Sequence, residues 1–311
     1  MDTTAVVFDS PRNLSLRNLA LPVLAEGEVL VEMEWSGIST GTERLLWRGE
    51  MPQFPGLGYP LVPGYESIGR VTAVSDEASD LLDRQVFVPG ARCYGEIRGL
   101  FGGSASKVVV DASRVVPIDE SLGQQGVLLA LAATAYHAVS PENASLPDLI
   151  VGHGVLGRLL ARLAVMAGDE PPVVWETNPT RHAGARGYQV TSPEDDSRRD
   201  YQSIYDVSGD ASLLDELIGR LAPQGELVLA GFYSAPISFA FPPAFMKEAK
   251  LRVAAEWQPE DLILVRELIE EGRLDLDGLI THHNPASAAT SAYQTAFEDS
   301  DCLKMVLDWR N

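Results

Sequence analysis

LIVGHGVLGRLLARLAVMAG, residues 149–168, is the stretch of this chain that indicates its fold most directly. The apolar run 149–151 predicts the end of a buried strand, and leucines then recur at helical spacing as far as Ala167. Between the two patterns, Gly152, Gly154 and Gly157 fit G-x-G-x-x-G. The sequence therefore predicts a strand, a tight glycine turn and a helix.

Such a turn is typical of a dinucleotide site, where the first glycine permits the turn, the second lets a pyrophosphate approach and the third allows close helix–strand packing. The N–H groups that open the helix then face the phosphates. The motif alone is also compatible with glycines that only shape the turn. The residues that we assign to a cofactor here are Gly152, His153, Gly154, Val155, Leu156 and Gly157.

An acidic residue follows the second apolar run, 173–175, at the place where a nucleotide ribose is expected. Glu176 lies nineteen residues past Gly157 (176 − 157 = 19). A carboxylate there accepts hydrogen bonds from the ribose hydroxyls and repels a 2′-phosphate, which favours NAD over NADP. Arg181 and Arg186 follow closely, and an arginine near this strand end is how NADP is accommodated. Arg181 is therefore a cofactor candidate, and NADP stays open as the alternative.

Further apolar runs continue the alternation of strands and helices. Strands are predicted at 188–190, 203–209, 225–232 and 251–256, and helical patterns at 213–221 and 261–269. The alternation predicts an α/β fold with a doubly wound parallel sheet of the Rossmann type. Ligands bind at the carboxyl ends of such strands, so Ser208, Gly231 and Phe232 are cofactor candidates, although glycines also end strands without a ligand.

Composition limits the classes of protein to consider. The 311 residues are 45% hydrophobic, no apolar run approaches the ~20 residues of a membrane span, and the N-terminus lacks the pattern of a signal peptide, so we expect a cytoplasmic protein with no membrane span. The net charge of −20 argues against nucleic acid as a partner. The only cysteines, Cys93 and Cys302, do not support a disulfide framework or a cysteine-rich metal site.

The first 120 residues differ from the rest in having many prolines and glycines and little helical pattern. Alternating runs at 28–35 and 67–74 predict a β-rich domain, and the run 303–309 predicts a strand that returns to it. We expect this domain at 1–120, completed by 275–311, and a nucleotide-binding domain at 121–274. The active site is expected in the cleft between them.

The order of these parts resembles the medium-chain dehydrogenase/reductase superfamily over essentially the whole chain. The motifs that carry the resemblance are SGISTGTE at 36–43, PLVPGYESIGRV at 60–71, TAYHA at 134–138 and VGHGVLG at 151–157. The resemblance implies a GroES-like β domain before a Rossmann domain and adds Thr134 to the cofactor candidates. The stretch 37–71 most resembles a zinc-lacking branch that oxidises the 3-(1-hydroxyethyl) group of a tetrapyrrole, bacteriochlorophyllide a, with NAD.

Zinc-dependent members of that superfamily carry a cysteine, a histidine and a second cysteine at positions where this chain differs. It has Ser39 and Thr40 in the first motif, Tyr65 in the second and Ala130 ahead of the helix threonine. Only Glu66 survives as a ligand, and one carboxylate does not make the three-ligand site that catalytic zinc requires. We therefore expect no metal.

Without a metal, a positioned polar group must take the proton of the alcohol while the hydride leaves. The resemblance places Tyr65 there, with Ser39 and with Thr42 or Thr40 in the relay and Glu66 behind it. The alternative is that Tyr65 and Glu66 only stabilise a turn of the β domain.

A loop-rich stretch with several aromatic residues would suit a large flat macrocycle. Trp47, Phe54 and Tyr59 are the candidate contacts, and Arg48 is placed to meet a propionate group. The alternative is that the aromatic residues belong to the core of the β domain. His137, in the helix motif, is a further substrate candidate, although helix histidines are more often simply packed.

Two other functions stay open. One is a zinc-free NADPH-dependent enone or quinone reductase, which Glu176 opposes; the other is a non-catalytic nucleotide-binding regulatory protein, which the specific match at 37–71 opposes. The oligomeric state is also open, with a homodimer as one alternative.

Overall fold

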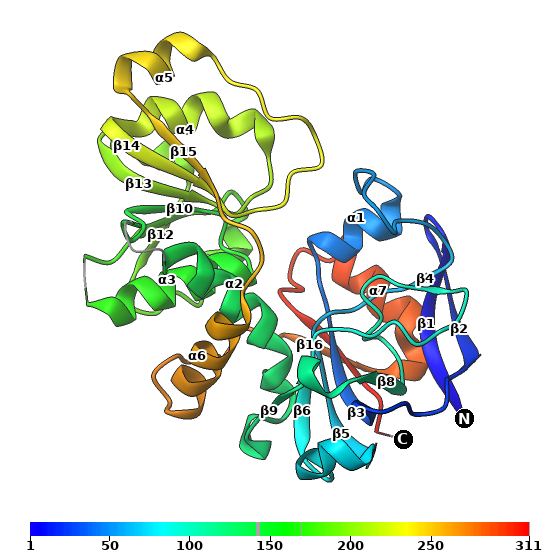
Figure 1. Cartoon of the computed structure of the whole chain (residues 1–311). Coiled ribbons are helices and arrows are strands. Elements are labelled where there is room, and N and C mark those ends of the chain that lie inside the picture. The colour runs from blue at the N-terminus through cyan, green and yellow to red at the C-terminus, as the bar shows by residue number, and fades with distance from the viewer. Residues whose placement is uncertain (141–143, 169, 311) are drawn as a thin grey trace. The chain divides into compact units, whose positions relative to one another are not determined.

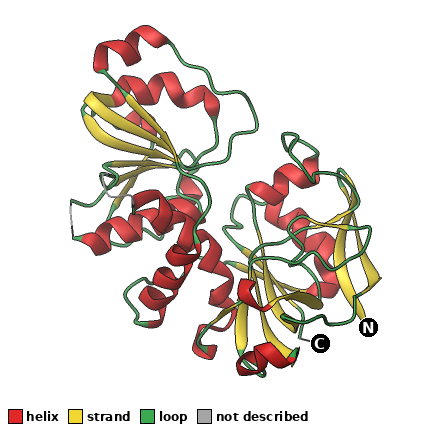
Figure 2. Ribbon diagram, in the orientation of Figure 1, coloured by secondary structure: helices red, strands yellow, loops and turns green. Residues whose placement is uncertain are grey.

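The computed structural model describes residues 1–140, 144–168 and 170–310, which form two compact units. Unit 1 comprises residues 1–130 and 279–311, and unit 2 comprises residues 131–278 (Figures 1 and 2). The first boundary lies ten residues beyond the expected one (130 − 120 = 10) because the 3₁₀ segment η3 (Glu120–Leu128) packs against strands of unit 1. The second lies four residues beyond it (278 − 274 = 4).

Unit 2 is built on a parallel sheet with the order β12-β11-β10-β13-β14-β15. The order runs outward from β10 in both directions, which is the doubly wound arrangement of a Rossmann fold. The strands are β10 (Leu149–Val151), β11 (Val173–Trp175), β12 (Gln189–Thr191), β13 (Tyr201–Asp206), β14 (Leu221–Leu229) and β15 (Lys250–Val253). The predicted fold class is confirmed.

Helices cover both faces of this sheet, with α3 on one face and α4 and α5 on the other (Figure 1). The helices are α2 (Leu129–Val139), α3 (Val155–Ala167), α4 (Leu214–Arg220), α5 (Phe241–Lys247) and α6 (Pro259–Glu270). The connection from β11 to β12 contains no α-helix, because its described residues form only the 3₁₀ turn η4 (Pro179–Arg181). The crossing from β12 to β13 likewise forms only η5 (Pro193–Asp195).

Three strands of unit 2 end three residues earlier than the apolar runs predict. They end at Asp206, Leu229 and Val253 instead of at 209, 232 and 256. In β13 the cause is visible: the Asp206 carboxylate accepts hydrogen bonds from the main-chain N–H (2.8 Å) and the hydroxyl (2.6 Å) of Ser208, which turns the chain out of the sheet. Ser208 therefore lies in the loop beyond the strand.

Unit 1 contains two sheets. One has the order β2-β1-β4-β7, and the other has the order β16-β17-β3-β5-β6-β9, with β8 also paired to β3. The strands are β1 (Asp2–Ser10), β2 (Asn13–Ala20), β3 (Glu28–Ile38), β4 (Leu61–Val62), β5 (Ser67–Val74), β6 (Gln85–Val88), β7 (Arg98–Gly99), β8 (Lys107–Asp111), β9 (Val116–Pro117), β16 (His282–Pro285) and β17 (Met305–Asp308); the helices are α1 (Thr42–Arg48) and α7 (Ala289–Glu298).

The C-terminal segment completes unit 1. Strand β17 runs antiparallel to β3, with Met305 opposite Ile38, as the apolar run 303–309 predicts. Helix α7 packs against β16, β17 and β2, and its Tyr293 and Phe297 join the same apolar core as the N-terminal strands. Among the described residues, no helix is long and apolar enough to cross a membrane.

Candidate active site and dinucleotide-binding turn

The glycine turn of unit 2 requires its glycines. Gly152 has φ +108°, in the left-handed region that other residues rarely adopt. A Cβ on Gly157 would lie 1.9 Å from the main-chain oxygen of Gly152, so only glycine lets α3 approach the end of β10 this closely. A Cβ on Gly154 would meet nothing within 4 Å, which leaves open space beside the turn. These features support the dinucleotide interpretation of the motif.

The carboxylate of Glu176 lies against this turn. Its Oε2 accepts from the main-chain N–H of His153 (3.2 Å), and its Oε1 accepts from the main-chain N–H of Asn178 (2.8 Å). Each carboxylate oxygen has a second lone pair, so Glu176 can still accept from a ribose hydroxyl. Arg181 lies at the end of η4, five residues further on.

His153 does not face a ligand with its side chain. The imidazole is buried, with Nδ1 2.6 Å from the main-chain oxygen of Arg181 and Nε2 2.9 Å from the hydroxyl of Tyr188. Only its main chain belongs to the turn, so a direct contact of the imidazole with a cofactor is not supported by this geometry.

Most of the other cofactor candidates of unit 2 follow the carboxyl ends of strands. Val155 and Leu156 open α3, Thr134 lies on α2, and Ser208, Gly231 and Phe232 follow β13 and β14. Asp206, which the sequence analysis does not single out, is buried among them, and its Oδ2 accepts from the hydroxyl of Tyr233 (2.6 Å). Burial raises the pKa of Asp206.

In unit 1, three hydroxyl groups meet where the first and second motifs come together. The Oγ of Ser39 and the hydroxyl of Tyr65 share a hydrogen bond of 2.6 Å, and Thr42, the first residue of α1, lies close enough to Tyr65 to lower the pKa of its phenol. The ring of Phe101 packs edge-on against Tyr65, with centroids 5.3 Å apart. Thr40 is half-buried beside Ser39 in the chain. The structure thus brings Ser39, Thr42 and Tyr65 into one cluster.

Burial raises the pKa of the Tyr65 phenol above its usual range, and the charge of Glu66 raises it further. The phenol therefore keeps its proton at neutral pH. Tyr65 can pass on a proton while it receives another, but it does not supply a standing phenolate base.

Glu66 is completely buried and forms an ion pair that the sequence analysis misses. Its Oε2 accepts from the Nζ of Lys304 (2.6 Å), which also donates to the main-chain oxygen of Ile38 (3.3 Å). Among the described residues, Glu66 Oε1 has no hydrogen-bond partner. Lys304 is separated from Glu66 by 238 positions, so no local pattern signals the pair.

Glu43 is a second buried carboxyl group that the sequence analysis misses. Its Oε1 accepts from the main-chain N–H of Ser39 (3.2 Å), and its Oε2 accepts from the hydroxyl of Tyr293 (2.9 Å) on α7. Burial, with the charge of Glu66, raises the pKa of Glu43 from 4.5 to about 8. Glu43 therefore positions the main chain of Ser39 through this hydrogen bond, next to the hydroxyl cluster.

The candidate substrate residues of unit 1 are partly engaged within the unit. Trp47 packs against Phe297, with ring centroids 5.5 Å apart, and the Tyr59 hydroxyl donates to the main-chain oxygen of Leu46. Phe54 is exposed, and the half-buried Arg48 forms a long ion pair with the exposed Glu50 (3.9 Å). Trp47 and Tyr59 are therefore engaged within the unit, whereas Phe54 and Arg48 are at least partly accessible to a ligand.

His137, the remaining substrate candidate, belongs to unit 2. Its Nδ1 lies 2.7 Å from Oδ2 of Asp261, the carboxylate that also caps the start of α6. This contact joins α2 to α6, so it gives His137 a structural role whatever else the residue does.

The donor set in unit 1 does not suit zinc. Ser39 and Tyr65 offer neutral hydroxyl groups, Ala130 offers no donor, and Glu66 is already paired with Lys304. Zinc sites are built from thiolate, imidazole and carboxylate ligands. Among the described residues, no group of three or more His, Cys, Asp or Glu side chains lies close enough to hold a metal ion.

Comparisons with known proteins agree with this architecture. Residues 25–120 match the family described as the alcohol dehydrogenase GroES-like domain. Proteins named 2-desacetyl-2-hydroxyethyl bacteriochlorophyllide A dehydrogenase are 57% identical in Rhodobacter capsulatus and 58% identical in Cereibacter sphaeroides, each match covering 100% of this chain and 99% of the relative. A solved Escherichia coli alcohol dehydrogenase in complex with NADH superimposes with a TM-score of 0.83 at 21% identity, over 99% of each chain.

A GroES-like unit completed by the C-terminal strand, together with a Rossmann unit, defines an oxidoreductase of the alcohol dehydrogenase type in the medium-chain dehydrogenase/reductase superfamily. The full-length identity then narrows the assignment. Within that superfamily, the chain belongs to the family of the bacteriochlorophyllide a dehydrogenases.

Proposed function

We propose that the protein oxidises the 3-(1-hydroxyethyl) group of bacteriochlorophyllide a to a 3-acetyl group, with NAD as hydride acceptor and without zinc. The observation that carries the proposal is the full-length identity of 57–58% to relatives named for this substrate. The hydroxyl cluster of Ser39, Thr42 and Tyr65 supports a mechanism that needs no metal.

Alcohol oxidation removes a hydride from the carbinol carbon and a proton from its oxygen. The nicotinamide ring, when bound, supplies the hydride acceptor. Tyr65 orients the alcohol oxygen and accepts its proton as it passes its own to Thr42, whose half-buried hydroxyl releases a proton to solvent. Because the phenol stays neutral throughout, the raised pKa of Tyr65 does not oppose this transfer. Ser39 keeps the phenol in place through its 2.6 Å hydrogen bond.

The assignment of NAD rests on Glu176, whose charge opposes a 2′-phosphate. Glu176→Ala is expected to weaken NAD binding and to lower the preference for NAD over NADP. The measurement is the ratio of kcat/KM for the two dinucleotides. An unchanged ratio would rule out Glu176 as the selector.

A flat tetrapyrrole would contact the exposed side of the stretch 47–59. Phe54 offers an apolar surface, and Arg48 offers a cation for a propionate because its ion pair with Glu50 is long and solvent-exposed. Trp47 and Tyr59 then act mainly by supporting this stretch, and His137 of unit 2 is a further candidate substrate contact.

One assay separates this function from the alternatives. Purified protein is mixed with hydroxyethyl-bacteriochlorophyllide and either NAD or NADP, and dinucleotide reduction and the acetyl product are followed together. Product formation with NAD is the expected result. A parallel reaction contains NADPH with an enone or a quinone, and turnover in that reaction alone would favour the reductase. Dinucleotide binding without turnover in either reaction would favour a regulatory protein.

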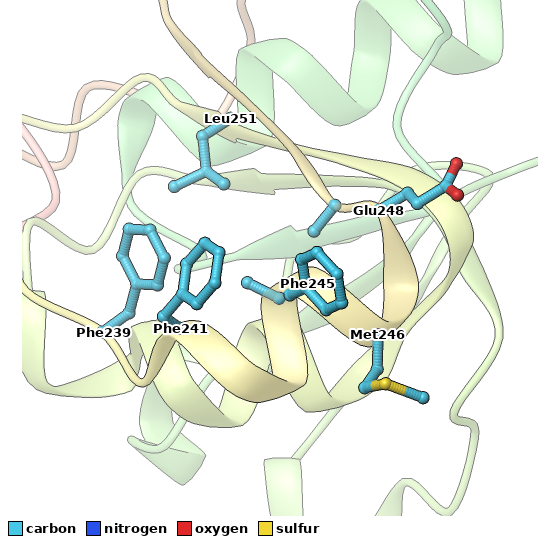
Figure 3. A pocket seen from close by; sticks show the side chains of 8 residues that line it. Phe239, Phe241, Phe245, Met246, Glu248 and Leu251 are labelled. Carbon is cyan, nitrogen blue, oxygen red and sulfur yellow. The ribbon is translucent and has the colours of Figure 1, made fainter.

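We also infer a homodimer, because unit 2 exposes an apolar surface at the end of its sheet. Phe239, Phe241 and Phe245 lie side by side on and before α5, below Leu251 of β15 (Figure 3). Met246 and Val253 are 78% and 75% exposed, and β15 is the last strand in the sheet order. In a twofold-symmetric dimer, this apolar surface of one copy would pack against the same surface of the other copy.

Light scattering should give a mass twice that of one chain. Val253→Lys should lower the measured mass to that of one chain, and a monomeric parent would contradict the inference.

A further inference from the structure

Buried side chains connect the loop between β11 and β12 to the glycine turn through hydrogen bonds. Doubly wound sheets usually cross between strands through a helix, whose main-chain groups bond one another. Here the crossing contains only η4, so its main-chain oxygens need other donors. His153 from the turn and Arg158 from α3 provide them.

The imidazole of His153 has a defined protonation state. Because the main-chain oxygen of Arg181 only accepts, Nδ1 carries the proton and donates across 2.6 Å. Nε2 is then unprotonated and accepts from the hydroxyl of Tyr188 at 2.9 Å. Burial lowers the pKa of His153 to about 4, so this neutral tautomer is the one present at neutral pH.

Arg158 donates one hydrogen bond to the glycine turn and two to the same loop. Its Nε donates to the main-chain oxygen of His153 (3.1 Å), and its Nη2 donates to those of Arg181 (3.0 Å) and Ala183 (2.9 Å). The side chain is only 6% exposed. A planar guanidinium holds several acceptors at fixed angles, which an ammonium group does not.

The loop that His153 and Arg158 hold in place includes Glu176, the carboxylate that we propose selects the dinucleotide. Glu176 accepts from the main chain of His153 and of Asn178, and its own main-chain oxygen accepts from Nε2 of His182 (2.8 Å). The carboxylate therefore stays beside the turn only while the turn and the loop keep their relative positions.

We propose that His153 and Arg158 are positioning residues for dinucleotide selectivity: they hold the loop 176–183 against the glycine turn, so that Glu176 meets the ribose and excludes a 2′-phosphate. The inference rests on the proposed NAD-dependent function. It requires neither side chain to touch the dinucleotide.

The test is fluorescence titration of the full chain with NADH and with NADPH, which needs no tetrapyrrole. His153→Phe keeps a ring but loses both hydrogen bonds of the imidazole. The Kd for NADH should rise about tenfold or more, because each lost buried hydrogen bond corresponds to a factor of up to about ten. The ratio Kd(NADPH)/Kd(NADH) should fall. Arg158→Lys should act in the same direction. Tyr188→Phe, which keeps the bond from Nδ1 to Arg181, should act less.

Arg162 offers a matched control one turn further along α3. It is 7% exposed and donates to the main-chain oxygens of Asp275 (2.6 Å) and Asp277 (2.9 Å), not to those of the loop 176–183. Arg162→Lys should therefore lower the melting temperature as Arg158→Lys does but leave the Kd ratio unchanged.

An unchanged Kd ratio in folded His153→Phe and Arg158→Lys would overturn the inference, even if both variants melt earlier. If one of the two does not fold, the other and Tyr188→Phe decide. A parent that binds neither dinucleotide would overturn the proposed function itself, which is a different outcome from a selective parent whose variants keep its selectivity.

Discussion

Hydroxyl groups lie at the positions where the resemblance to zinc-dependent dehydrogenases places metal ligands. Ser39 and Tyr65 come from two different motifs and lie 26 positions apart in the chain, yet they share a hydrogen bond of 2.6 Å. The motifs point to these residues, whereas their protonation follows from burial, which keeps Tyr65 neutral and raises the pKa of Glu43 to about 8. Two predictions follow at the scale of single residues.

Tyr65→Phe should lower kcat by about 10²–10⁴-fold, because it removes a positioned acid–base group while it keeps the ring that packs on Phe101. The Kd for NADH and the melting temperature should change little. Thr42→Val should lower kcat less, because a water molecule can replace the lost hydroxyl. Tyr94→Phe, which removes a buried hydroxyl from elsewhere in unit 1, is the control. Parental kcat in both Tyr65→Phe and Thr42→Val would show that the relay is wrong.

Glu43→Gln should change how stability depends on pH. The carboxyl loses its proton near pH 4.5 in the unfolded chain and near pH 8 in the folded one, so between these values the folded state binds more protons. Its contribution to stability is therefore present below pH 4.5 and is lost as the pH rises towards and through 8. Melting temperatures from pH 6 to 9 should fall more steeply for the parent than for Glu43→Gln. The exposed Glu96→Gln should follow the parent, and parallel curves for all three proteins would contradict the prediction.

At the scale of elements, the C-terminal strand and helix complete the unit that the N-terminal strands begin. Strand β17 pairs with β3, and the preceding Lys304 reaches the buried Glu66, while α7 supplies Tyr293 to Glu43. The apolar run at 303–309 predicts the strand because its pattern is local. The same local pattern does not predict that Lys304 pairs with the buried Glu66.

Lys304→Met should destabilise the protein by about 3–5 kcal/mol, because it leaves the carboxylate of Glu66 buried without a counter-charge. Chemical denaturation followed by fluorescence measures the loss. The double variant Lys304→Met with Glu66→Gln should recover much of it. The exposed pair of Lys107 and Glu32 provides the comparison, since Lys107→Met should cost at most about 1 kcal/mol. Equal losses at the two sites would contradict the assignment of a buried ion pair.

At the scale of the whole molecule, the chain combines an alcohol dehydrogenase architecture with a donor set that does not suit zinc. The proposed chemistry therefore depends on the hydroxyl cluster of unit 1 and on the glycine turn of unit 2, each built within its own unit.

Metal analysis of the pure protein should find no stoichiometric zinc, and chelators should leave turnover intact, because one paired carboxylate and neutral hydroxyl groups bind zinc poorly. Elemental analysis after dialysis, with a zinc-dependent alcohol dehydrogenase treated in parallel, makes the measurement. Activity that a chelator abolishes and zinc restores would contradict the metal-free mechanism.

Local sequence patterns predict the order of strands and helices, the glycine turn and the acid after β11, because periodicity and turn chemistry act between near neighbours. The predicted ends of three strands lie three residues too far, and in β13 the reason is the turn that the Asp206 carboxylate forms with Ser208. Only the tertiary structure decided the partners: Lys304 for Glu66, Tyr293 for Glu43 at a separation of 250 positions, and Arg181 for His153. Such pairs depend on how distant segments pack, and burial then sets their protonation, neither of which any local pattern records.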